Sequence, residues 1–266
     1  MASADDLIDD SRTAEPQPST RPNAFAELMK PKKRKVAPDT TDAPTSRTMF
    51  AGRGGLGAYT ADPESFPASR VVYYNDKFVV INDLFPKAQV HLLILPRDKS
   101  KYLLDPQDAF DDPTFLADCQ AEEKKVRAIV ANELRRKFGA FSKSEQPRRH
   151  AMESNDSPDE LPLGRDWSKD VISGIHANPS MTHLHIHVLS RDMVSEPMKK
   201  RNHYQSFTTD FLISLDQFPL EARDYRRRYG KFPDDMICWR CGKNFGNKMV
   251  KLKEHLNIEL DDWKTV

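Results

Sequence analysis

The sequence is poor in apolar residues and contains no long apolar run. Of its 266 residues, 38% are hydrophobic and 30% are charged. No apolar stretch approaches the roughly 20 residues that a membrane-spanning helix needs. The first residues also lack the apolar centre of a signal peptide. We therefore expect neither membrane insertion nor secretion.

Cysteine is scarce, and neither sign of charge is in large excess. Three cysteines are too few for a disulfide framework, so the closely spaced Cys238 and Cys241 indicate metal binding in a reducing compartment. A net charge of +1 argues against a uniformly basic coat. Basic residues nevertheless gather as KKR at 199–201 and RRR at 226–228. Such a local surface suits a polyanion, because phosphate contacts supply most of the affinity for nucleic acid.

Residues 1–47 mix Pro, Ser, Thr, Asp and Lys with few large apolar side chains. Burial of so few apolar groups would not offset the entropy lost on folding, so we expect this segment to be disordered. Within it, PKKRKV at 31–36 matches a short nuclear-localisation run, although basic tails also bind polyanions. We predict a nuclear protein whose tail contacts a partner.

Period-two apolar runs predict strands in RVVYY, FVVIND and VHLLILP, which lie between residues 70 and 96. Helical spacing predicts one long helix over 115–139. Further strands are expected around 170–176, at 183–190 and in FTTDFLISL at 207–215, and an exposed loop at 141–168. Successive strands with helices on one side predict an α+β fold with an antiparallel sheet.

The stretch MTHLHIHVLS places histidines at alternate positions 183, 185 and 187. On a strand these three imidazoles share one face. A His-x-His pair can hold zinc with a third ligand, or one imidazole can attack phosphorus while its neighbours bind phosphate oxygens. At about 3.3 Å per residue the outer pair is roughly 13 Å apart, so one ion cannot take all three. The Pro-Ser turn before this stretch lets Ser180 offer a hydroxyl to an anion, which favours phosphate chemistry.

A second cluster lies near the C-terminus. Cys238 and Cys241 are followed by His255 and, one helical turn later, by Glu259. The spacing of His255 and Glu259 brings both side chains to one helix face, which predicts a tetrahedral structural zinc site with one ion. The fourth ligand is open at this point, because carboxylate is unusual there and Asp261 and Asp262 lie close.

Several separated motifs resemble one known family. HLHIHVLS is similar to the signature strand of the histidine-triad nucleotide hydrolases and transferases. GIHANPSMTHLHIHVLS, DLFPKAQVHLLILPR and HYQSF together resemble the aprataxins in their short fungal form, which has a C-terminal zinc finger and no forkhead-associated domain. The resemblance implies a histidine-triad fold over 48–217 and a zinc-finger module that binds DNA over 218–266. It also implies Glu259 as the fourth zinc ligand.

The resemblance also implies an activity. Aprataxins cleave DNA that carries 5′-linked AMP, an abortive ligation product, into AMP and a 5′-phosphate end, and their product serves DNA repair. By position, His185 is then the nucleophile that forms an adenylyl-histidine, His187 and Ser180 contact phosphate oxygens, His176 serves the departing DNA phosphate, and His183 supports the pocket. Asp83 would hold the ribose, with Lys87 and His91 facing the phosphates.

Basic and polar residues of the C-terminal third are expected to position DNA through its phosphates, without reading sequence. They are Lys199, Lys200, Arg201, His203, Tyr204, Ser206, Lys243, Lys248 and Lys251. The family places an aromatic before the first strands to stack on the broken DNA end, whereas GRGGLGAY at 52–59 offers glycines and Phe50 is out of register. That stacking contact is therefore in doubt.

Other functions remain open at this level. The same chemistry could act on small dinucleotides or capped RNA, although a small-molecule hydrolase needs neither a zinc module nor a basic connector. The chain could instead be a zinc-finger nucleic-acid-binding protein without catalysis, or a hydrolase with two zinc ions. We expect a monomeric nuclear enzyme that acts on nicked or broken DNA, releases AMP and contacts a repair protein through its tail.

Overall fold

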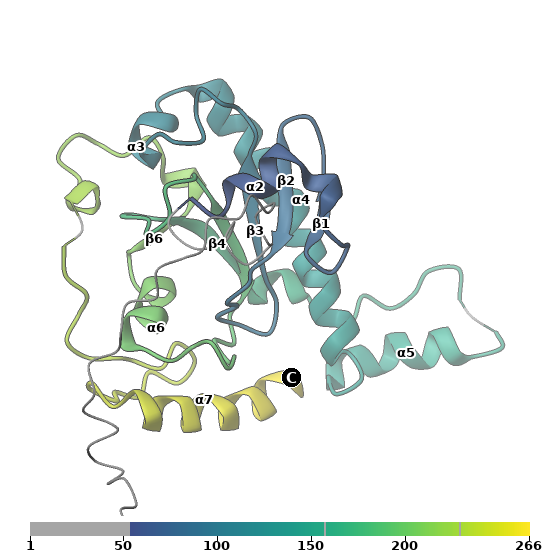
Figure 1. Ribbon diagram of the computed structural model, residues 1–266. Helices are drawn as coiled ribbons and strands as arrows, with labels where there is room; N and C mark the ends of the chain where they lie inside the picture. Colours follow the sequence, from purple (N-terminus) through teal and green to yellow (C-terminus); the bar gives the residue numbers. More distant parts are fainter. Residues whose placement is uncertain (1–53, 157, 229) are drawn as a thin grey trace, which may run out of the picture. The chain divides into compact units, whose positions relative to one another are not determined.

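The computed structural model describes residues 54–266 except 157 and 229. Its centre is an antiparallel sheet with strand order β1-β2-β3-β5-β4-β6 (Figure 1). The strands are β1 (Val71–Tyr74), β2 (Phe78–Asn82), β3 (His91–Pro96), β4 (Val171–His176), β5 (Ile186–Ser190) and β6 (Leu212–Ile213). The predicted α+β class is confirmed, and the first three predicted strands occur where the sequence pattern put them.

Six helices accompany the sheet in the described part of the chain. They are α2 (Gly57–Ala61), α3 (Pro106–Ala109), α4 (Pro113–Phe138), α5 (Gln146–Glu153), α6 (Arg201–Thr208) and α7 (Met249–Lys264). The long predicted helix is confirmed as α4. Asp112 directly precedes this helix, and its carboxylate caps the first turn by accepting hydrogen bonds from the backbone N–H groups of Thr114 and Phe115.

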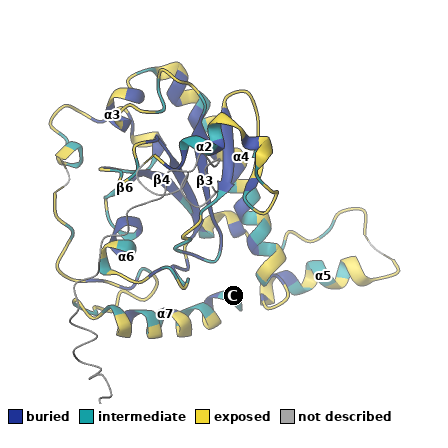
Figure 2. Cartoon of the chain, viewed as in Figure 1, coloured by how far each residue is buried: buried dark blue, intermediate teal, exposed yellow. Residues whose placement is uncertain are grey.

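The two faces of the central strands bury different side chains. Val80 of β2 and Ile94 of β3 belong to the main core, which α4 covers. Their neighbours Ile81 and Leu93 point the other way, into a smaller cluster shared with α2. Burial is accordingly concentrated on the strands, whereas α5 contains only intermediate and exposed residues (Figure 2). Both faces of the sheet are therefore packed.

Two sequence predictions of local structure were wrong. FTTDFLISL was expected to be one strand, but α6 continues to Thr208 and only Leu212–Ile213 pairs with β4. The hydroxyls of Thr208 and Thr209 donate to the carbonyls of Tyr204 and Gln205, and so provide hydrogen-bond donors where the helix ends. The expected loop at 141–168 contains α5 and ends in the buried Trp167.

Helix α7 packs in two separate hydrophobic clusters. Leu252 and Leu256 join a cluster with Tyr204 and Met236, residues that lie on both sides of the expected module boundary at 217. Trp263, two turns further on, lies in the main core. Its indole Nε1 donates to Asp170, while Arg165 stacks on the ring and donates to the Trp263 carbonyl.

Among the described residues, no helix combines the length and the apolar composition that a membrane crossing requires. The expected disordered tail, its basic run at 31–36 and Phe50 lie outside the described residues.

Candidate active site and zinc-binding cluster

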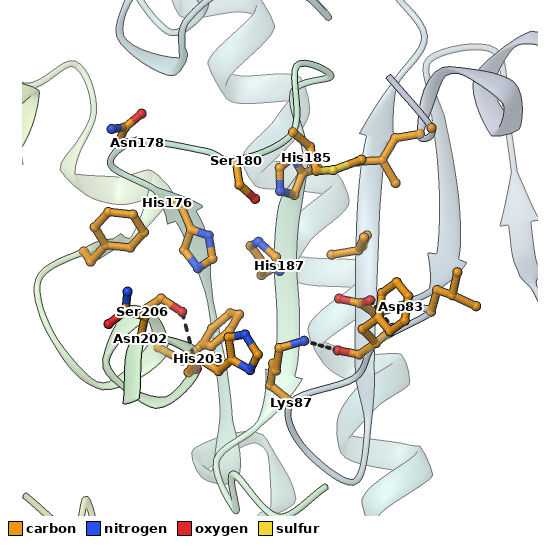
Figure 3. A pocket seen from close by; sticks show the side chains of 18 of the residues that line it. Asp83, Lys87, His176, Asn178, Ser180, His185, His187, Asn202, His203 and Ser206 are labelled. Carbon is orange, nitrogen blue, oxygen red and sulfur yellow. Dashed lines mark hydrogen bonds between the residues drawn. The ribbon is translucent and has the colours of Figure 1, made fainter. Parts of the chain in front are cut away.

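A cavity of about 650 Å³ lies where β2, β3, β4 and β5 meet α2 and α6. Figure 3 shows His176, His185, His187 and Ser180 turned toward the same space, with Asp83 and Lys87 across from them. Part of the cavity wall is apolar and is formed by the side chains of Leu56, Tyr59, Ile81, Leu93 and Met181. The cavity thus combines an apolar slot, suited to a nucleobase, with a polar wall, suited to phosphate.

His185 is held in one tautomer. Its Nδ1 lies 2.7 Å from the carbonyl oxygen of His183, and a carbonyl only accepts hydrogen bonds. Nδ1 therefore carries the proton, and Nε2 keeps a lone pair. Burial lowers the pKa of His185 below 6.5, against opposing effects of the His183 carbonyl and Asp83. The imidazole is therefore neutral at pH 7, as a nucleophile must be.

A second hydrogen-bond chain fixes the tautomer of His187. The backbone N–H of Lys87 donates to Nδ1 of His91 over 3.1 Å, so the proton of His91 is on Nε2. That atom lies 3.0 Å from Nδ1 of His187. Nδ1 of His187 is therefore the acceptor, and Nε2 carries a proton with no hydrogen-bond partner among the described residues. This N–H is a donor available for a phosphate oxygen.

His91 itself does not line the cavity. The family resemblance implied that it faces the phosphates, but its side chain is completely buried and both ring nitrogens are engaged behind His187. Its pKa falls from 6.5 to about 4, mainly because of burial. His91 thus acts on the cavity through His187.

His176 approaches His187 from β4. The two ring centroids are 4.3 Å apart, and His176 also packs against Phe207 and Phe211. Its Nε2 has no hydrogen-bond partner in the described part of the chain. Burial, aided by His185, holds the pKa of His176 well below 6.5. His176 therefore faces the cavity as a neutral ring.

His183 is placed apart from the other two motif histidines. We expected one strand to present all three on one face, but β5 begins at Ile186, so His183 and His185 precede the regular strand. His183 is buried, stacks on the ring of Tyr102 and is not among the cavity-lining residues. A supporting role fits this position, and contact with a substrate does not.

The loop between β2 and β3 carries Asp83 and Lys87. Oδ1 of Asp83 accepts a hydrogen bond from the N–H of Phe85 at 2.7 Å, and Oδ2 lies 3.5 Å from Nδ1 of His91. The ammonium group of Lys87 donates to the carbonyl of Phe85. Burial lowers the pKa of Lys87, although Asp83 opposes this effect. Asp83 and Lys87 both line the cavity.

Sequence reasoning missed part of the lining. The apolar side chains of Leu56, Tyr59 and Met181 and the amides of Asn178 and Asn202 all border the cavity. Leu56 and Tyr59 belong to the GRGGLGAY segment, where the sequence left the stacking contact with the DNA end in doubt. Tyr59 is 4% exposed and packs on Phe66, so its ring forms part of the slot. Of these lining residues, Asn178 is the one that the local sequence could have indicated, because it lies in the turn between His176 and Ser180.

The predicted metal ligands come together. One atom from each of Cys238, Cys241, His255 and Glu259 lies within 4.8 Å of the others. Sγ of Cys241 is 3.1 Å from Nε2 of His255, which is 3.2 Å from Oε1 of Glu259. Two thiols, one imidazole and one carboxylate suit a tetrahedral zinc ion. Arg240 pairs with the other oxygen of Glu259 and orients that carboxylate.

The expected DNA-contacting residues divide into three groups. Lys199, Lys200, Lys243, Lys248 and Lys251 are exposed, and Arg201 is partly buried with a hydrogen bond to the carbonyl of Asp234. His203 and Ser206 line the cavity. Tyr204 does not fit the expectation, because its side chain is completely buried. Its hydroxyl donates to the carbonyl of Ile237 and accepts from the N–H of Trp239.

The RRR run at 226–228 is also less available than its sequence indicated. Arg226 pairs with Asp224, which holds the pKa of that carboxyl at about 2. Arg227 donates to the carbonyls of Leu220 and Glu221. The side chains of these two arginines therefore stabilise the local conformation of residues 220–227.

Two family models match the chain. The HIT domain matches residues 67–194, and the C2HE / C2H2 / C2HC zinc-binding finger matches residues 208–262. Together with the histidine-lined cavity and the Cys-Cys-His-Glu cluster, they define a HIT-domain protein that carries a zinc-binding finger.

An aprataxin-like protein of Schizosaccharomyces pombe is 30% identical over 243 residues, which cover 91% of this chain and 94% of that protein. Another, from Saccharomyces cerevisiae, is 34% identical over 223 residues, which cover 79% and 96%. The chain belongs to the aprataxin-like family.

Solved structures agree with this assignment. The aprataxin orthologue Hnt3 from Schizosaccharomyces pombe matches with a TM-score of 0.63 at 29% identity, covering 80% of this chain and 95% of that one. Hnt3 in complex with DNA and guanosine matches with a TM-score of 0.61 at 30% identity, covering 80% and 99%. The expected histidine-triad fold with a C-terminal zinc-binding finger is thus confirmed.

Proposed function

We propose that this protein is a DNA repair enzyme that hydrolyses 5′-adenylated DNA ends to AMP and a 5′-phosphate. The observation that carries the proposal is the contact between Nδ1 of His185 and the carbonyl of His183, because it leaves a lone pair on Nε2 of a neutral imidazole at the cavity. Two of the similar Hnt3 structures are complexes with DNA, one of them also with guanosine. This supports a polynucleotide substrate.

In the first step, Nε2 of His185 attacks the phosphorus of the AMP moiety. A P–N bond forms while the bond from that phosphorus to the bridging oxygen breaks, and the DNA 5′-phosphate leaves with the electron pair. His176 is neutral, so it supplies a hydrogen bond to the leaving oxygen instead of a spare proton. That is sufficient help, because a phosphate monoester with a second pKa of about 6 leaves readily.

In the second step, water attacks the phosphorus of the adenylyl-histidine. The P–N electron pair returns to Nε2, AMP leaves, and the extra water proton passes to solvent. In both steps the N–H of His187 and the hydroxyl of Ser180 donate to non-bridging oxygens. Such preorganised donors stabilise charge that shifts onto those oxygens in the transition state. Asp83 accepts from ribose hydroxyls, and the apolar slot receives the base.

We further propose that one structural zinc ion binds Cys238, Cys241, His255 and Glu259. The ion would tie α7 to the turn that carries the two cysteines, and the exposed lysines of this module would contact phosphates. Metal analysis should give one zinc per chain, and Cys238→Ser should lose it and weaken DNA binding. Two bound zinc ions would favour the two-zinc hydrolase, for which Asp83, His91 and His187 are the other available ligands.

The deciding experiment uses a nicked duplex that bears a 5′-AMP. We expect AMP, a 5′-phosphate end and a trapped protein adduct whose mass increases by one adenylyl group on His185. His185→Ala should bind the DNA without turnover. Faster cleavage of small dinucleotides or capped RNA would favour the second enzyme hypothesis. Binding without an adduct in the wild-type protein would favour a non-catalytic nucleic-acid-binding protein.

Three expectations accompany this proposal. Nuclear import and a repair-protein contact both depend on the N-terminal tail, which lies outside the described residues. A monomer is the third. Fluorescent fusions with and without PKKRKV, and light scattering of the purified chain, test import and oligomeric state.

A further inference from the structure

The peptide group between His183 and Leu184 is hydrogen-bonded on both sides. Its carbonyl oxygen accepts from Nδ1 of His185 at 2.7 Å. Its N–H donates to the carbonyl oxygen of Tyr102, also at 2.7 Å. A peptide group is planar and rigid. The hydrogen bonds at its two ends therefore couple the position of the Tyr102 carbonyl to that of the His185 imidazole.

Tyr102 also contacts this segment through its ring. The rings of Tyr102 and His183 stack with centroids 4.8 Å apart and planes inclined by 8°. Nδ1 of His183 lies 2.8 Å from the carbonyl of Leu184, so this ring is attached to the same short segment. The stacked pair therefore restrains the residue whose carbonyl orients His185.

The segment that carries Tyr102 is itself anchored. The N–H of Tyr102 donates to the carbonyl of Asp98 at 2.9 Å, and the Asp98 carboxylate accepts from Ser100. Next to Tyr102, Lys101 pairs at 3.1 Å with Asp112, the residue that caps α4. Tyr102 and its neighbour Lys101 thus link the motif histidines to the start of α4.

We propose that Tyr102 is a positioning residue for His185, acting through the His183–Leu184 peptide. The ring of Tyr102 holds His183 in place. The backbone carbonyl of Tyr102 accepts a hydrogen bond from the N–H of the His183–Leu184 peptide group, whose own carbonyl accepts from His185. Successive hydrogen bonds polarise one another, so the Tyr102 carbonyl strengthens the hold of the His183 carbonyl on Nδ1–H. This inference rests on the proposed role of His185 as the nucleophile.

Tyr102 does not line the cavity, so its effect should be on the reaction rate and not on substrate binding. Misplacing a reacting group by a fraction of an ångström to one ångström costs up to about a hundredfold in rate. Only the ring is required for stacking, because the hydrogen bond to Leu184 uses the backbone of Tyr102.

The test uses the full-length zinc-loaded protein with three substitutions. Tyr102→Phe keeps the stacked ring and is the matched control. Tyr102→Ala removes the ring, and Tyr102→Leu fills most of its volume without a plane, which guards against a folding failure of the alanine variant. For each variant we would measure kcat and KM on the 5′-adenylated nick, the thermal midpoint, and the ¹⁵N chemical shifts of the His185 imidazole.

We expect Tyr102→Phe to match the wild type. Tyr102→Ala and Tyr102→Leu should lower kcat about tenfold with KM changed less than about twofold. Their His185 ¹⁵N shifts should move toward a mixture of tautomers. Unchanged kcat and unchanged shifts in both variants would overturn the proposal, and so would a lowered thermal midpoint as the only effect. Failure of the nucleophile assignment is distinguishable, since the wild-type protein would then form no adduct whatever the variants do.

Discussion

Nε2 of His91 lies 3.0 Å from Nδ1 of His187, and this contact decides which nitrogen of His187 faces the cavity as a donor. The N–H of Lys87 completes the chain at the other nitrogen of His91. A residue that cannot reach the substrate thereby sets the hydrogen-bonding character of one that can.

Removal of His91 should therefore lower turnover without removing any cavity-lining group. His91→Ala leaves Nδ1 of His187 without its donor, and we expect kcat to fall about tenfold or more, because the donor to the phosphate oxygens is then aligned for only part of the time. His91→Gln, whose amide nitrogen can replace Nε2, should recover much of the rate. Single-turnover kinetics would measure this, and equal rates for both variants would contradict the hydrogen-bond chain.

The pH dependence of kcat/KM should show an acid limb below pH 6.5. Burial lowers the pKa of His185 from 6.5, and the neutral ring is the reactive form. Activity is then fully developed at neutral pH and falls as pH drops through the lowered pKa. Circular dichroism over the same range would confirm that the protein stays folded. An acid limb centred above pH 6.5 would show that burial does not govern this group.

Tyr204→Phe should lower the free energy of unfolding and leave direct DNA contacts intact. The substitution removes the hydroxyl partner of the Ile237 carbonyl and the Trp239 N–H, which are partly buried, and we expect a loss of about 1 kcal/mol for each hydrogen bond. Urea unfolding would measure the loss. Had Tyr204 contacted DNA, the opposite pattern would appear, with a raised Kd for DNA and unchanged stability.

The exposed lysines of the zinc module should determine the salt dependence of DNA binding. Replacing Lys243, Lys248 and Lys251 together by Ala should reduce the slope of log K against log salt by about 0.9 for each phosphate that is no longer neutralised. The effect should be the same for unrelated DNA sequences, since phosphate contacts carry no sequence information. Lys169→Ala, an exposed lysine outside this module, is the matched control and should leave the slope unchanged.

Sequence patterns identified the site residues that are close neighbours along the chain. His185 and His187 are two residues apart, and Cys238 and Cys241 are three apart, so the main chain alone brings each pair together. The apolar slot could not be identified in this way, because Leu56 and Met181 come from distant segments and resemble ordinary core residues. Its composition depends on how α2 packs against the sheet.

The errors have a physical cause of the same kind. Tyr204 sits in a motif that suggested DNA contact, but the zinc-binding segment covers it. Residues 201–208 form α6, although the run FTTDFLISL favours a strand. Tertiary packing overrode local preference at both places.

Trp263 makes the last turn of α7 part of the main hydrophobic core. Trp263 is 3% exposed within the main core, more than 70 residues beyond the cavity histidines along the chain. A premature stop that removed only the final four residues would spare every proposed ligand of zinc and every cavity residue. It would nevertheless act as a large-to-small core substitution, so such a truncated chain should be lost through misfolding and degradation, with no chemical group of the site altered.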